Sequence, residues 1–348
     1  MAKKIFATGA TGYIGGDAIY ALLRANPEYE VSCLVRSAAK ATELAARHPS
    51  IRIVDGTLDD LELLEEEAAN ADIVCNFAHA THEPSVSALA KGLARRQRAG
   101  YGYLIHTMGS GTMIYEDVVQ RRFGEHSDKI FNDSEGLPEV LAVPDFAKAR
   151  GAEKAVRDAG AENNDRVKTA IVCTGSAYGH GRGLVEYRVS AIHELVRCTL
   201  SRGHGLQVGS GKSAWRNVYI RDLSDVFVKL ITRAVNDEPD SEDAEKSVWG
   251  GEGGYYFVEN GEHVWGELAR AISDEAVAQG LIQDGDIESI DAAEAARLAP
   301  MCNFFWGCNA RVEGRRPARV LNWQPVGPSL VEELEVIVKK EAEKLGLS

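Results

Sequence analysis

The sequence predicts an α/β fold in which a doubly wound parallel sheet is joined to a smaller, partly discontinuous C-terminal domain. Short apolar runs alternate with helix-like segments through the first half of the chain, as right-handed βαβ crossovers require. The runs are apolar throughout, which is typical of strands that helices cover on both faces. Past residue 174 the alternation loosens, and we expect a domain that caps the sheet.

Each predicted strand of the first half is a short apolar run, and each predicted helix mixes apolar with polar or charged residues. The predicted strands are Ile5–Ala7, Val31–Val35, Ile51–Val54, Asp72–Phe77, Gly102–Thr107 and Val167–Thr174. The predicted helices are Ala18–Leu23, Ala39–Arg47, the acidic segment Leu58–Ala69, Val86–Arg98 and Arg150–Ala159.

The second half has fewer elements. They are an amphipathic helix Leu184–Ser201, a strand Val218–Asp222, a helix Leu223–Val235, a strand Tyr255–Glu259, a helix Trp265–Gln279 and a terminal amphipathic helix Ser329–Leu345. Residues 236–247 are acidic, contain Pro239 and predict an exposed insertion. We expect residues 1–175 to form one domain to which 218–235 return, and residues 176–217 and 248–348 to form the other.

Composition predicts an enzyme-sized chain of 348 residues that acts on small molecules. The formal net charge of −13 argues against broad binding to nucleic acid or to an anionic membrane surface. The sequence has no apolar run of about 18 residues and no signal-peptide core, so the cytoplasm is the expected location.

The six cysteines predict neither a disulfide framework nor a metal site. Cys33, Cys75 and Cys173 lie inside strand-like runs, where a buried thiol is the usual occupant. Cys302 and Cys308 lack metal-ligand spacing, and no Cys-x-x-Cys pair occurs.

A glycine turn follows the first predicted strand. Gly9, Gly12 and Gly15 are spaced Gly-x-x-Gly-x-x-Gly and lead into the first helix. Gly9 allows a tight turn, Gly12 allows backbone N–H groups to approach a pyrophosphate, and Gly15 allows the helix to pack on the sheet. The turn therefore predicts a Rossmann dinucleotide site, whose other members are Thr11, Tyr13 and Ile14.

The end of the second predicted strand favours NADP(H) over NAD(H). An acidic residue that would hold the adenosine ribose is missing there, and Arg36 follows the strand instead. A guanidinium suits a 2′-phosphate, and Ser37 and Lys40 add a hydroxyl and a second charge. The alternative is that Arg36 only extends over the adenine site.

These residues resemble those of the extended short-chain dehydrogenases/reductases, which include the nucleoside-diphosphate-sugar epimerases and the NmrA-like proteins, over nearly the whole chain. The matching segments are Thr8–Gly15, Asp55–Asp59, Ala78, His106–Ser110, Ser176–Gly179 and Arg221–Leu223. The resemblance implies that Thr57 and Leu58 lie near the adenine, Phe77 and Ala78 near the nicotinamide ribose, and Thr107 to Ser110 beside the reacting centre.

The chain departs from this family at its Tyr-x-x-x-Lys pair. In the register set by Glu153, Asp145 stands in the place of the tyrosine and Ala149 in the place of the lysine. Lys148 is one residue out of register, about 100 degrees around a helix. It either reaches the ribose from a helix that starts differently or is a surface lysine.

A second departure concerns the substrate. Sugar-nucleotide members carry an arginine before the returning helix, and in that register this chain has Trp215, with Arg216 one residue later. Because successive strand residues point to opposite faces, we expect the Arg216 guanidinium to be turned away. An indole suits an apolar or aromatic substrate, and Tyr115, Ser176, Tyr178 and Trp306 are further candidates for its pocket.

Thr107 and Ser110 are candidate hydrogen-bond donors to a substrate carbonyl, and Tyr178 is the best phenol to replace the missing tyrosine; with Lys148 these residues form the predicted catalytic set. His106 is expected to be a packed histidine.

The sequence leaves three functions open. The first is an NADP(H)-dependent oxidoreductase acting on a small, mostly apolar carbonyl, imine or enone. The second is a nucleoside-diphosphate-sugar epimerase or dehydratase. The third is an NmrA-like redox sensor that binds NADP(H) without turnover and regulates a protein partner. A homodimer is also left open, because Leu184–Ser201 fits a dimer face as well as a support for a lid.

Overall fold

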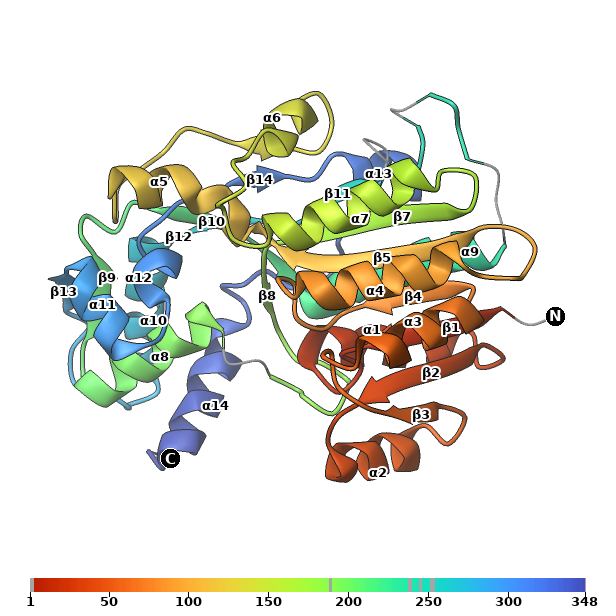
Figure 1. Ribbon diagram of the computed structural model, residues 1–348. Helices are drawn as coiled ribbons and strands as arrows, with labels where there is room; N and C mark the ends of the chain where they lie inside the picture. Colours follow the sequence, from red (N-terminus) through yellow and green to blue (C-terminus); the bar gives the residue numbers. More distant parts are fainter. Residues whose placement is uncertain (1–2, 188–189, 237–239, 244–245, 251–253, 348) are drawn as a thin grey trace.

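A computed structural model describes residues 3–187, 190–236, 240–243, 246–250 and 254–347. Its centre is a seven-stranded, all-parallel sheet in the order β11-β7-β5-β4-β1-β2-β3 (Figure 1). The strands are β1 (Lys4–Thr8), β2 (Glu30–Val35), β3 (Arg52–Asp55), β4 (Ile73–Asn76), β5 (Gly102–Gly109), β7 (Val167–Thr174) and β11 (Tyr255–Val258). The doubly wound fold is therefore confirmed.

Helices cover both faces of this sheet. On one face lie α1 (Tyr13–Ala25), α2 (Ala38–Arg47) and α9 (Ile220–Val235); on the other lie α3 (Leu61–Asn70), α4 (Glu83–Ala94) and α7 (Arg150–Glu162). In β1, Ile5 and Ala7 pack under the first set and Phe6 under the second, as the alternation of strand side chains requires. Helix α9, which covers the helix predicted at Leu223–Val235, packs in the same core cluster as α1, and its Phe227 contacts Phe77 edge to face.

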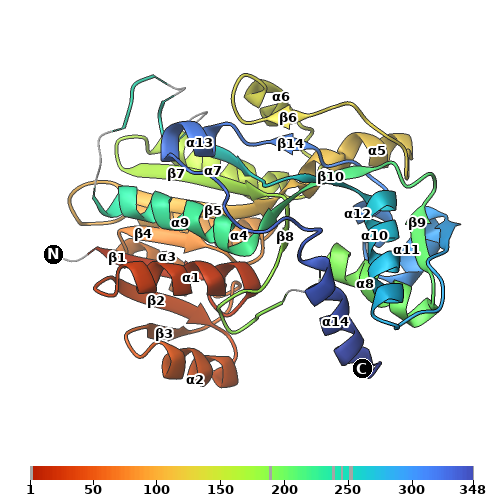
Figure 2. The same cartoon turned by 180° about the vertical axis from the view of Figure 1, so that it is seen from behind.

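The C-terminal lobe lies at the carboxyl edge of the sheet (Figures 1 and 2). It contains the small sheets β12-β10-β8 (Glu262–Val264, Ala214–Tyr219, Ser176–Tyr178) and β13-β9 (Ile287–Ile290, Gly205–Val208). Its helices are α8 (Ala191–Arg202), α10 (Trp265–Ala278), α11 (Ala292–Leu298), α12 (Cys302–Phe305) and α14 (Leu334–Leu345).

Short elements link the two parts. After β5 come η1 (Ser110–Ile114), α5 (Tyr115–Gln120), β6 (Phe131–Asn132) and α6 (Leu137–Leu141); near the C-terminus, β14 (Val312–Glu313) pairs with β6 and precedes α13 (Arg316–Leu321).

Several predicted boundaries are wrong, and three of them lie in the second half of the chain. The helix predicted from Leu184 begins only at Ala191, and residues 188–189 lie outside the described part. The strand predicted over Val218–Asp222 is β10, Ala214–Tyr219, and α9 begins directly after it at Ile220. In the first turn of α9, the Asp222 carboxylate accepts hydrogen bonds from the Val326 and Gly327 backbone N–H groups. The terminal helix begins at Leu334 rather than Ser329.

The predicted insertion 236–247 is described only in part, since residues 237–239 and 244–245 lie outside the described residues. Glu242, Asp243 and Lys246 are exposed, whereas the Asp240 carboxylate accepts hydrogen bonds from the Val248 backbone N–H and the Ser247 hydroxyl. Among the helices of the described residues, none is both long enough and apolar enough to cross a membrane.

All six cysteines are free and buried, as expected for the three in strands. In the described ranges, no three His, Cys, Asp or Glu side chains gather in a way that could hold a metal ion.

Candidate active site

The glycine turn joins β1 to α1 at the centre of the sheet's carboxyl edge. Gly9 has φ +77°, and the Gly12 N–H donates to its carbonyl oxygen at 2.9 Å. A Cβ on Gly15 would lie 2.4 Å from that oxygen and 2.8 Å from Phe77 Cβ, so only glycine allows α1 to pack this closely. A Cβ on Gly12 would meet a single atom of the described chain within 4 Å, the Gly9 oxygen at 3.2 Å.

This arrangement fits a dinucleotide. The turn lies where the strand order reverses between β1 and β4, and ligands of open α/β sheets bind at such a crevice. The first N–H groups of α1, from Tyr13 and Ile14, have no acceptor one turn earlier in a helix and suit phosphate oxygens. Thr11, half-buried, completes the turn. The Tyr13 hydroxyl donates to the Gly179 carbonyl at 2.6 Å and ties the turn to the chain after β8.

The residues predicted to bind the adenosine follow the next two strands at the same edge. Arg36 is exposed at the end of β2, and the Ser37 hydroxyl accepts from the Lys40 N–H at 3.4 Å as the cap of α2. After β3, the Thr57 hydroxyl donates to the Asp60 carboxylate at 2.9 Å, and Leu58 is half-buried beside it. The fold therefore brings these predicted residues to one edge.

The end of β5 presents two hydroxyl groups. Thr107 and Ser110 are 5% and 1% exposed, and neither hydroxyl has a hydrogen-bond partner among the described residues. Between them Gly109 is exposed, and apart from its two chain neighbours no atom of the described residues lies within 4 Å of the place its Cβ would take. A buried hydroxyl without a partner is costly. The two groups are therefore candidates to hydrogen-bond an oxygen of a bound molecule.

Tyr178 is not available for catalysis, which corrects the prediction from the sequence. Its side chain is completely buried, and its hydroxyl donates to the Pro328 carbonyl at 2.7 Å. Burial also raises the pKa of the phenol above its ordinary value. Tyr178 anchors the segment before α14 to β8.

The segment 145–149, which aligns with the Tyr-x-x-x-Lys pair of the family, is not helical. Helix α7 begins at Arg150, as predicted, and Ala149 before it has φ +71°. The Thr112 hydroxyl donates to the Lys148 carbonyl at 2.7 Å, and the Lys148 side chain is exposed. Lys148 therefore lies in the turn before the helix, and the angular spacing of helical residues does not set the direction of its side chain.

Replacing Ala149 by glycine is expected to raise the free energy of unfolding by about 0.5 to 1 kcal/mol. The left-handed conformation costs a non-glycine residue about 1 to 2 kcal/mol, more than the extra entropy that glycine loses on folding. Urea unfolding measures the change. The matched control is Ala155→Gly in the middle of α7, expected to lose about 1 kcal/mol. Equal losses in the two variants would show that Ala149 is not strained.

Trp215 reaches the site from β10. Its Cη2 lies 3.7 Å from the place that a Cβ on Gly111 would take, next to Ser110, and its Nε1–H donates to the Cys308 carbonyl at 2.7 Å. The Arg216 guanidinium lies 3.4 Å from the Glu262 carboxylate and 3.7 Å from that of Glu259. The predicted turning away of Arg216 is therefore matched by an ion-pair network on the other face of the strand.

The remaining residues predicted to line the substrate pocket differ in how far their side chains are exposed. Trp306 is 1% exposed and donates from Nε1 to the Ala191 carbonyl at 2.9 Å, so the prediction that it lines the pocket is wrong. The indole instead fills the core of the C-terminal lobe. Tyr115 is half-buried, and its hydroxyl donates to Glu116; Ser176 is half-buried on β8.

Asp17 is a structural residue that the sequence interpretation missed. Its carboxylate is completely buried in α1 and accepts four hydrogen bonds, from the Arg182 backbone N–H, from Arg182 Nε and Nη2, and from the Ser224 hydroxyl. The bonds range from 2.6 to 2.9 Å and join the helix of the glycine turn to α9 and to the loop after β8. The available signal was a single acidic residue among the mostly apolar residues of this helix.

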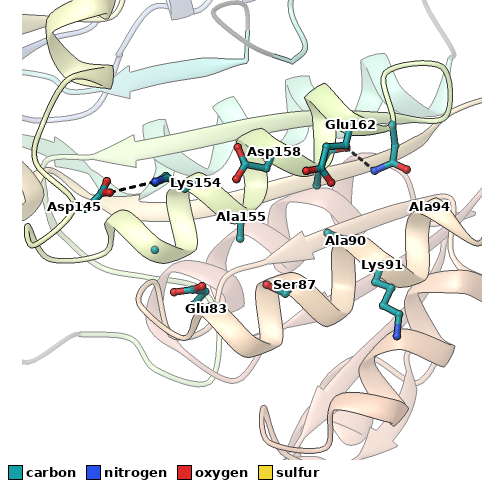
Figure 3. Close-up of a pocket in the computed structure, with 13 residues that line it drawn as sticks. Glu83, Ser87, Ala90, Lys91, Ala94, Asp145, Lys154, Ala155, Asp158 and Glu162 are labelled. Carbon is teal, nitrogen blue, oxygen red and sulfur yellow. Dashed lines mark hydrogen bonds and ion pairs between the residues drawn. The ribbon is translucent and has the colours of Figure 1, made fainter.

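A groove of about 740 Å³ lies away from this edge, between α4 and α7 (Figure 3). Glu83 and Ser87 line it from α4, and Asp158 and Glu162 from α7. None of the predicted site residues lines this groove, and it lies on a helix-covered face rather than at the carboxyl ends of the strands. We therefore place the active site at the glycine turn and the end of β5.

Comparisons with known proteins point to a cofactor-binding domain in this chain. Residues 9–164 match the family model described as NAD(P)H-binding. The whole chain is 88% identical to a protein named Oxidase ucsJ from an Acremonium species, with 100% of both chains covered. An uncharacterized Saccharomyces cerevisiae protein, YLL056C, is 22% identical over 95% of this chain and 97% of its own length.

Solved structures share the fold at low sequence identity. The dTDP-glucose 4,6-dehydratase DesIV from Streptomyces venezuelae, with NAD bound, has a TM-score of 0.64 and 18% identity, covering 99% of this chain and 98% of its own. The UDP-glucuronic acid 4-epimerase from Bacillus cereus, in complex with UDP-glucuronic acid and NAD, has a TM-score of 0.65 and 14% identity, covering 98% and 99%.

Proposed function

We propose that this chain, in which residues 9–164 match an NAD(P)H-binding model and which is 88% identical to a protein named an oxidase, is an NADP(H)-dependent oxidoreductase of the extended short-chain dehydrogenase/reductase family. The shared fold of solved epimerases and dehydratases supports this family assignment. Its substrate in this proposal is a small, mostly apolar carbonyl, imine or enone, or the corresponding reduced compound. The observation that carries the proposal is the pair of buried hydroxyls at the end of β5, which have no hydrogen-bond partner among the described residues and lie at the same edge of the sheet as the glycine turn.

The residues divide the work as follows. The nicotinamide supplies or accepts a hydride. The glycine turn and the start of α1 hold the pyrophosphate, and Arg36 with Ser37 holds the 2′-phosphate. The Thr107 and Ser110 hydroxyls donate hydrogen bonds to the reacting substrate oxygen or nitrogen and polarise its bond to carbon. Hydride transfer is reversible, so the oxidase named among the relatives is consistent with the same site working in the oxidative direction.

The surroundings of Trp215 support an apolar substrate over a nucleoside-diphosphate sugar. Trp215 stands where sugar-nucleotide members carry an arginine, and Arg216 is engaged by Glu259 and Glu262. A substrate pyrophosphate would therefore have to displace two carboxylates to reach that guanidinium.

The test is NADPH consumption, and NADP⁺ reduction in the reverse direction, against a panel of aromatic ketones, imines, enones and the matching alcohols. Turnover of an apolar member supports the proposal. Epimerisation and dehydration leave no net change in the cofactor, so UDP- and dTDP-glucose are assayed separately by chromatography of the sugar nucleotide. Conversion of either one, without turnover of the panel, would establish the epimerase or dehydratase alternative. Tight NADPH binding without turnover of any compound would establish the NmrA-like sensor.

Replacing Arg36 by aspartate is expected to reverse the cofactor preference. In the wild type the guanidinium should make NADPH bind at least about tenfold more tightly than NADH, a difference of about 1.4 kcal/mol. Fluorescence titration with both cofactors measures it. Arg24→Asp, at the opposite end of α1, is the charge-matched control and should leave the preference unchanged. Equal wild-type affinities would remove the basis for NADP(H).

A further inference from the structure

Three polar side chains form a row across the centre of the sheet. Thr8 ends β1, Asn76 ends β4, and His106 lies in β5; the strand register places Thr8 beside Asn76 and Asn76 beside His106. Each is at most 1% exposed. The row lies one residue before Gly9 and Phe77, which start the loops that meet at the proposed cofactor site.

The hydrogen bonds in this row run in one direction. The Thr8 hydroxyl donates to Asn76 Oδ1 at 2.5 Å, so the NH2 group of the Asn76 side chain faces His106. Asn76 Nδ2 lies 3.0 Å from His106 Nδ1 and, being an N–H donor, makes Nδ1 the acceptor. A neutral imidazole that accepts at Nδ1 carries its proton on Nε2.

His106 is therefore a fixed donor rather than a base. Desolvation by burial lowers its pKa to about 4, and the Ala80 backbone carbonyl opposes this effect only in part. Its Nε2 has no partner of normal hydrogen-bond geometry within the described ranges. The Ala80 carbonyl belongs to the loop after β4, which begins with Phe77 and Ala78 against Gly9.

We propose that Thr8, Asn76 and His106 are positioning residues that set the loop from Ala78 to Ala80 for the cofactor, with His106 Nε2–H closing onto the Ala80 carbonyl when the cofactor is bound. The hydrogen bonds from Thr8 to Asn76 and from Asn76 to His106, here called the relay, keep the His106 proton on Nε2. That proton in turn holds the position of the loop that forms the wall of the nicotinamide half of the site. This role rests on the cofactor site of the proposed function, but not on any substrate.

Two substitutions at His106 separate this role from packing. In His106→Gln the side-chain amide reaches the Nε2 position and keeps a donor for Ala80, while the acceptor at the Nδ1 position is lost. In His106→Asn the carbonyl replaces Nδ1 and still accepts from Asn76, but no donor reaches Ala80. The proposal predicts that His106→Asn weakens cofactor binding about tenfold while His106→Gln stays within about threefold.

Stability should follow the opposite order, because His106→Gln leaves the buried Asn76 amide without an acceptor. Fluorescence titration uses whichever of NADPH and NADH binds the wild type more tightly, so an incorrect cofactor preference does not affect the outcome. Urea unfolding gives the stability of each variant. His193→Asn, at a buried histidine of the C-terminal lobe whose pKa is also lowered to about 4, is the control and should leave cofactor affinity unchanged.

A spectroscopic measurement tests the relay without a ligand. Nitrogen-15 NMR of wild-type imidazoles should show His106 as the neutral Nε2–H tautomer from pH 5.5 to 8, and Asn76→Asp, which replaces the donor by a carboxylate oxygen, should move its proton to Nδ1. An Nδ1–H tautomer in the wild type would overturn the proposal. Affinities that fall in the same order as stability across the His106 variants would also overturn it, because packing alone predicts that order.

Discussion

Replacing Ser110 by alanine and Thr107 by valine together is expected to lower NADPH-dependent turnover by about 10² to 10⁴-fold. The two hydroxyls are buried, unpartnered and separated by the open space at Gly109, so removing them leaves the substrate oxygen or nitrogen without its donors. The measurement is initial-rate kinetics with the best substrate of the panel, together with NADPH titration to show that the cofactor still binds.

Two controls separate these hydroxyls from the other candidates. Tyr178→Phe should leave turnover nearly unchanged and cost about 1 kcal/mol of stability, because it removes only the hydrogen bond to Pro328. Lys148→Ala, at an exposed side chain, should also leave the rate nearly unchanged. A large loss in Lys148→Ala with normal turnover in the double variant would place the catalytic group in the segment before α7.

Replacing Asp17 by alanine is expected to lower the free energy of unfolding by about 3 to 5 kcal/mol. The carboxylate is fully buried and satisfied by four hydrogen bonds, and its removal leaves the partly buried Arg182 guanidinium without its carboxylate partner. Urea unfolding gives the change. The same variant should also loosen the loop after β8, which a protease assay of that loop detects.

The double variant Asp17→Ala with Arg182→Ala tests the mechanism of that loss. If the unpaired guanidinium is the cause, the double variant is more stable than the sum of the single losses predicts. Glu43→Ala, which breaks the exposed Arg47–Glu43 pair on α2, is the surface control and should cost no more than about 1 kcal/mol. A loss for Asp17→Ala as small as that of Glu43→Ala would contradict the assigned role.

The sequence predicted the parts of the site that local geometry determines. The glycine turn needs a positive φ at Gly9 and a close helix approach at Gly15, and both requirements depend on residues a few positions apart. The strands that carry Arg36, Thr57 and Thr107 are continuous apolar runs, and parallel strands bring their carboxyl ends to one edge. The sequence therefore determined the sheet, its dinucleotide turn and the hydroxyls at the end of β5.

Only the tertiary structure decided which polar side chains already have a hydrogen-bond partner within the protein. The Tyr178 hydroxyl donates a hydrogen bond to Pro328, 150 residues away, and the Asp17 carboxylate accepts one from Arg182, 165 residues away. No periodicity in the sequence predicts such pairs. The segment before α7 ends at Ala149 with φ +71°, and the Lys148 carbonyl in it accepts a hydrogen bond from Thr112, which belongs to η1. A hydrogen bond over such a separation depends on how the elements pack in space, and for that reason the sequence could propose catalytic groups but the fold had to choose among them.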